Sequence, residues 1–139
     1  MEMTIDKIGK EYFSKKRESD IIDFQWTDSF GLKVTISTWL DSDKQIGIEY
    51  EFNDFNGFRY LDEGDFLGYW DLPDFRNGFH LFKIIKGGWK SGEITQGGIL
   101  DVSRVTDNLY EFFISTTNSC LTVLAYEKPT ITEIELKNE

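Results

Sequence analysis

The chain has 139 residues, of which 40% are apolar and 29% charged, and this composition predicts one globular domain over residues 1–139. Twenty-five acidic residues against fifteen basic ones give a net charge of −10. That charge disfavours nucleic acid and anionic membranes as partners, because both repel an acidic surface, and it permits a basic protein partner.

The first segment of the chain shows helical spacing. Ile5, Ile8, Tyr12 and Phe13 fall at positions i, i+3, i+7 and i+8, which lie on one face of a helix. Thr4 is a suitable N-cap for that helix. We therefore predict one N-terminal helix.

From residue 31 onward the apolar residues alternate with polar ones, which is typical of half-buried strands. Turn residues at 41–44 and 53–57 separate the first strands, and the Asn56-Gly57 pair is a strong hairpin signal. The segment 79–86 is apolar enough for a strand buried on both faces. Four further strands follow as a meander, at 99–105, 109–116, 120–126 and 131–136. The pattern predicts a mainly β (α+β) fold: a single antiparallel sheet of about seven to nine strands, curled into a half-barrel or folded as a sandwich.

Charge and aromatic residues are concentrated in one quarter of the chain. Residues 41–75 contain ten acidic and two basic residues, a net charge of −8, whereas the remainder of the chain carries −2. Within this region, residues 58–78 mix aromatic and acidic side chains and fit neither the helical nor the strand period. Long irregular segments of a compact domain are often functional.

Aromatic anchors surrounded by charges of one sign are typical of a protein-binding surface. We therefore predict a partner-binding surface for a basic protein, and the alternative is a solvated acidic face that only aids solubility. Its expected residues are Asp62, Glu63, Asp65, Tyr69, Trp70, Asp71, Asp74 and Phe75.

The residues needed for common catalytic and metal sites are scarce. His80 and Cys120 are the only histidine and cysteine, so a zinc site of the usual nitrogen and sulfur type is nearly excluded. The spacing of Asp62, Glu63 and Asp65 does not match a calcium-binding EF-hand loop. We predict no catalytic residues, no metal and no cofactor. The lone cysteine and the lack of a signal-like apolar run favour a cytoplasmic protein.

In size, acidity and aromatic content the whole chain resembles bacterial toxin-immunity proteins, although no motif carries that resemblance. The resemblance implies an antagonist that masks the basic surface of a toxin, such as a nuclease-type toxin. Two other functions stay open. A curled, aromatic-rich sheet could enclose a lipid or a sugar. A carboxylate pair such as Asp71 and Asp74, with Trp70 or Trp89 to stack on a sugar ring, could act as a hydrolase.

Overall fold

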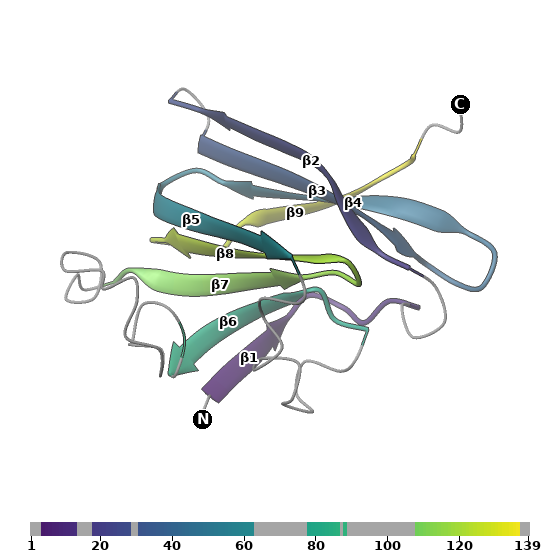
Figure 1. The fold of residues 1–139 in the computed structure, drawn as a ribbon, viewed down its shortest axis with the longest axis horizontal. Helices are drawn as coiled ribbons and strands as arrows, with labels where there is room; N and C mark the ends of the chain where they lie inside the picture. The colour runs from purple at the N-terminus through teal and green to yellow at the C-terminus, as the bar shows by residue number, and fades with distance from the viewer. Residues whose placement is uncertain are drawn as a thin grey trace.

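The computed structural model of the chain describes residues 4–13, 18–28, 31–62, 78–86, 88 and 108–136. Within these residues the chain forms β-strands and no helix (Figure 1). The strands are β1 (Thr4–Ile8), β2 (Asp20–Thr27), β3 (Gly31–Trp39), β4 (Gln45–Phe52), β5 (Phe55–Asp62), β6 (Leu81–Lys86), β7 (Tyr110–Ser115), β8 (Ser119–Ala125) and β9 (Thr130–Ile134). In this part of the chain, no helix is long and apolar enough to cross a membrane.

The strands form two antiparallel sheets, one of five strands in the order β1-β6-β7-β8-β5 and one of four in the order β2-β3-β4-β9. The prediction of a mainly β, antiparallel fold is confirmed, but the prediction of a single sheet is wrong. The chain changes sheets three times: between β1 and β2, between β4 and β5, and between β8 and β9. At the last two changes, β5 follows β4 but pairs with β8, and β9 follows β8 but pairs with β4. Short connections therefore join strands of different sheets here, which the sequence pattern does not reveal.

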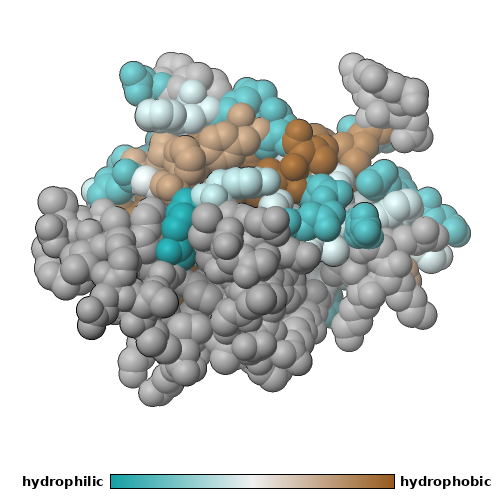
Figure 2. All heavy atoms as spheres, in the orientation of Figure 1, coloured by the Kyte–Doolittle hydropathy of each residue, from teal (hydrophilic) through white to brown (hydrophobic). Residues whose placement is uncertain are grey.

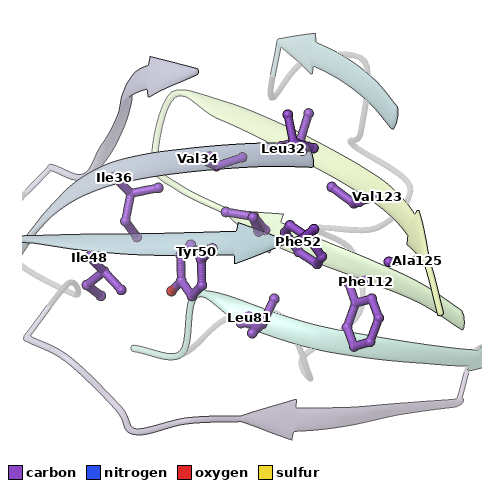
Figure 3. Close-up of a cluster of buried hydrophobic side chains, with 12 residues drawn as sticks. Leu32, Val34, Ile36, Ile48, Tyr50, Phe52, Leu81, Phe112, Val123 and Ala125 are labelled. Carbon is purple, nitrogen blue, oxygen red and sulfur yellow. The ribbon is translucent and has the colours of Figure 1, made fainter. Parts of the chain in front are cut away.

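The two sheets pack face to face around one apolar core (Figure 3). β3 and β4 supply alternate residues such as Leu32, Val34 and Phe52, and β7 and β8 supply Phe112 and Val123; all are at most 1% exposed. The rings of Phe52 and Phe112 meet across the two sheets with centroids 5.7 Å apart. Figure 3 shows these side chains pointing toward one another, so the architecture of the described residues is a β-sandwich.

The segment predicted as an N-terminal helix is instead the edge strand β1, which pairs antiparallel with β6. Ile5 lies opposite Ile84 and Ile8 lies opposite Leu81 in this ladder. Gly9 then adopts a left-handed backbone conformation with φ of 85°, which an α-helix does not allow. Tyr12 follows this break and packs against the core, and its distance in sequence from Ile5 and Ile8 happens to match the helical period. Phe13 is partly exposed.

Two turn predictions have opposite outcomes. The hairpin at 41–44 is confirmed: it joins β3 to β4, and one carboxylate oxygen of Asp41 accepts 2.8 Å hydrogen bonds from the backbone N–H groups of Asp43 and Lys44. Asn56 and Gly57, by contrast, lie within β5, where the register with β8 shifts. The Asn-Gly pair thus marks a bulge and not a hairpin turn, and the chain bends just before β5, at Asn53 and Asp54.

The central strands of the larger sheet are buried on both faces. Phe112 faces the sandwich core and its neighbour Phe113 faces the other side, yet they are 0% and 1% exposed. In β6, Leu81 and Phe82 show the same double burial, as predicted for the segment 79–86, although Ile85 is exposed. The core of the sandwich is therefore not exposed through the outer face of these central strands.

Candidate functional site

The predicted partner surface falls mostly outside the described residues. Asp62 is the last residue of β5, where its Cα lies opposite that of Ser119. The other predicted contacts, Glu63, Asp65, Tyr69, Trp70, Asp71, Asp74 and Phe75, lie outside the described part of the chain, as does Trp89. The prediction of a binding surface at these residues therefore stays a prediction, and the candidate site is built from the strands.

One side of the sandwich, between the edge strands β1 and β9, is bridged by polar contacts. The hydroxyl of Tyr12 donates a 3.0 Å hydrogen bond to the carboxylate of Glu133, and the Lys10 ammonium lies 2.7 Å from the same oxygen. The bonds from Lys10 and Tyr12 lower the pKa of Glu133, whereas burial and Glu133 raise the pKa of Tyr12. The segment after β1 thus ties the two sheets together at this side.

The opposite side, between the edge strands β2 and β5, carries aromatic side chains that reach solvent. Phe24 and Trp26 lie opposite the core residues Val34 and Leu32 in the ladder, so they belong to the inner face of their sheet. They are nevertheless 36% and 58% exposed. Phe24 packs edge-on against Phe58 of β5 with ring centroids 4.8 Å apart. The aromatic core therefore continues to the surface here.

We call this region the aromatic edge. Its residues come from both sheets and comprise Ile21, Ile22, Asp23, Phe24, Trp26, Phe55, Phe58 and Tyr60. A groove of about 410 Å³ runs between the two strands, lined by all of these residues except Trp26 and Phe55. Hydrophobic residues form a brown band across the molecule in Figure 2, over the region of β2 and β5 in Figure 1. Ile22 and Tyr60 are about half exposed, at 49% and 52%.

The formal charges on β2 are all negative. The strand contains Asp20 and Asp23 and has no lysine or arginine. Asp23 lines the groove, and the side chain of Gln25 donates a 2.8 Å hydrogen bond to its carboxylate. On β5, Arg59 follows Phe58 in the strand and therefore points to the opposite face of the sheet. The groove thus has apolar walls and one acidic residue, Asp23, whose side chain lies on the outer face of the sheet.

The chain's only histidine and only cysteine lie apart from this edge. His80 is buried: its Nε2 is 2.7 Å from the hydroxyl oxygen of Thr38, and its Nδ1 is 2.8 Å from the carbonyl oxygen of Ser115. Burial lowers the pKa of His80, so the ring is neutral at pH 7. Cys120 is fully buried. Among the described residues, no three His, Cys, Asp or Glu side chains form a group that could hold a metal ion.

The sequence contains a signal for the aromatic edge in the alternation of residues along β2. In β2, Asp23 and Gln25 alternate with Phe24 and Trp26, which is the pattern of a half-buried strand. The pattern assigns the aromatic residues to an inner face. It does not reveal that β2 is an edge strand, and it is this position that leaves their rings exposed.

Comparisons of the chain with protein-family models, with curated proteins and with solved structures find no match.

Proposed function

We propose that this chain is a protein-binding antagonist of the immunity type, which masks a basic surface of a toxin or of another cationic protein. The observation that carries the proposal is the aromatic edge, where Phe24 and Trp26 stand exposed on a strand whose only charges are Asp20 and Asp23. The net charge of −10 gives the whole molecule the same preference for a basic partner.

The two kinds of side chain would have different tasks in such a complex. Exposed aromatic rings lose solvent on binding and supply most of the contact energy, whereas carboxylates attract the partner over longer distances and raise the association rate. Inhibition would be steric and electrostatic, since an acidic surface would cover the basic residues with which a nuclease holds a phosphate backbone. The proposal extends to residues 62–75 as a second part of the partner surface, and it assigns the protein to the cytoplasm.

A second candidate function is favoured by the groove itself. A volume of about 410 Å³ with walls of Phe24, Phe58 and Tyr60 is in the range of small-ligand sites, about 300–1,000 Å³. A lipid chain or a sugar ring could lie along it. Against this function, the core between the sheets is filled by fully buried side chains such as Phe52 and Phe112, so the ligand would stay near the surface. The hydrolase alternative rests on Asp71 and Asp74, which lie outside the described residues.

The test of the proposed function uses the genes that neighbour the one encoding this chain, because antagonists of this type are commonly encoded beside their targets. Each neighbour that encodes a basic protein is expressed alone and together with this chain. We expect one neighbour to arrest growth, co-expression to restore growth, and the two proteins to elute as one complex. Trp26→Ala and Asp23→Lys should weaken the rescue. If no basic neighbour forms a complex with the chain, the proposal is wrong.

A further inference from the structure

Within the part of the chain that the structure describes, no strand pairs with the outer edge of β2. Among the described residues β2 pairs only with β3, and every second residue of an edge strand directs its N–H and C=O groups away from its one neighbour. The ladder with β3 is irregular between Ile21 and Asp23 and regular over residues 23–27. The regular part of β2 therefore presents an extended template of backbone donors and acceptors next to Phe24 and Trp26.

Natural edge strands are commonly protected from such pairing by lysine, proline or a bulge. β2 has a bulge at its beginning but no lysine and no proline in the regular part. The charged side chains that protect this edge are acidic, so they repel acidic strands and favour a basic one. A second copy pairing through β2 would place side by side two strands whose only charges are negative, at Asp20 and Asp23, and repulsion between like charges disfavours that pairing. A basic strand meets no such repulsion.

The neighbouring edge strand β5 fits a basic strand less well. β5 contains one base, Arg59, and one acid, Asp62, so its formal charge is zero, whereas β2 contains two acids and no base. In β2, by contrast, Asp23 and Gln25 face outward while Phe24 and Trp26 face inward, as the register with Lys33 and Val34 shows. An added strand would therefore need apolar side chains on its inner face and basic side chains on its outer face.

We propose that β2 binds its partner by strand addition: an extended segment with alternating basic and apolar residues pairs with residues 23–27 and enlarges the four-stranded sheet. Its apolar side chains would cover Phe24 and Trp26 and enter the groove beside Tyr60. Its basic side chains would lie on the outer face near Asp23. Directly opposed side chains on paired strands lie about 4.5–5.5 Å apart, close enough for both contacts. The inference rests on the proposed function, because it specifies how the basic partner binds the aromatic edge.

The test uses the full chain and a synthetic peptide of alternating lysine and isoleucine residues. Its control is the same peptide N-methylated on alternate residues, which keeps every charge and side chain but lacks the backbone N–H groups along one edge. Binding is measured by calorimetry, and hydrogen exchange locates it on the chain. We expect the first peptide to slow amide exchange in residues 23–27. The methylated peptide should bind about tenfold more weakly or worse, since a loss of one or two hydrogen bonds corresponds to that factor.

The outcomes separate the binding mode from the proposed function. If both peptides bind equally and Asp23→Lys abolishes both, strand addition is wrong while a basic partner at the aromatic edge stands. If neither peptide protects residues 23–27, strand addition at β2 is wrong as well, and the neighbouring-gene experiment decides the function independently. An alternating glutamate and isoleucine peptide that binds as tightly as the lysine peptide would contradict the assigned partner charge. Asp43→Lys makes the same change in net charge at an exposed position of the β3–β4 hairpin and should leave the binding nearly unchanged.

Discussion

His80 joins the two sheets through its ring nitrogens. Because Nδ1 lies on the Ser115 carbonyl oxygen, Nδ1 carries the proton and donates, and Nε2 then accepts from the Thr38 hydroxyl. Thr38 belongs to one sheet and Ser115 to the other. Both ring nitrogens of His80 therefore have hydrogen-bond partners, which explains its burial as a structural role without any catalytic one. The ring stays neutral at pH 7 because burial lowers its pKa.

The lowered pKa of His80 predicts how stability varies with pH. Below about pH 6.5 the unfolded chain binds a proton on this histidine that the folded chain does not, so the free energy of unfolding falls as the pH drops from 6.5 toward the folded-state pKa. Urea denaturation between about pH 7 and pH 5 measures this loss. His80→Asn should be less stable at pH 7 by about 1–3 kcal/mol and should show a flatter pH dependence in this interval. An equal slope in both proteins would contradict the assignment.

The exposure of aromatic residues predicts which of them the fold needs. Trp26 is 58% exposed at the aromatic edge, whereas Phe52 is buried in the core at 1%. Trp26→Ala should cost about 1 kcal/mol or less of unfolding free energy, and Phe52→Ala about 3–5 kcal/mol. Urea denaturation of the two variants gives the comparison. A loss above about 3 kcal/mol for Trp26→Ala would make that residue part of the scaffold and remove the anchor from the proposed surface.

At the scale of elements, the strands of the described region could largely be predicted, and their partners could not. Period-two alternation identifies β3 and β4, and Asp41 identifies the hairpin between them, because both signals are local. The strand β1 was predicted as a helix because its pairing with β6 depends on residues almost eighty positions away. The pairing of β5 with β8 and of β9 with β4 also depends on distant residues, so the sequence pattern could not assign β5 and β9 to different sheets. The aromatic edge exists only through this assignment, and the contacts predicted from the sequence therefore do not include Phe24, Trp26 or Phe58.

Two glycines in the strands predict opposite effects of the same substitution. Gly31, the first residue of β3, has φ of 83°, and an added Cβ would meet the backbone carbonyl oxygens of Phe52 and Asn53. Gly57 in the β5 bulge has no positive φ, and nothing lies within 4 Å of an added Cβ. Gly31→Ala should lose at least about 1–2 kcal/mol, and Gly57→Ala should be neutral or gain up to about 1 kcal/mol. Thermal unfolding measures both losses, and equal losses would contradict this description of the backbone at the two glycines.

At the scale of the whole molecule, the two sides of the sandwich differ in both chemistry and accessibility. Lys10, Tyr12 and Glu133 bridge the side between β1 and β9, whereas aromatic rings and an unpaired strand edge occupy the side between β2 and β5 among the described residues. Exposed aromatic residues and unpaired edges both promote association. The excess of negative charge counteracts association between identical copies, and the same charge attracts a basic partner.

That excess of charge predicts a dependence of stability on salt that needs no partner. A net charge of −10 on a chain of 139 residues destabilises the compact state by self-repulsion. Raising the salt from about 0.01 M to about 0.1 M shortens the screening length from about 30 Å to about 10 Å and weakens this repulsion. The melting temperature should therefore rise by about 3–5 °C, roughly the effect of 1 kcal/mol in a chain of this size. Calorimetry checks the rise.

The control is a variant with Asp28→Asn and Asp54→Asn, two exposed acids next to the aromatic edge, whose melting temperature should rise less with salt. A melting temperature that falls with salt would mean that ion pairs such as Lys10–Glu133 outweigh the repulsion between acidic residues. The acidic side chains would then stabilise the fold, and they would not be available to a partner.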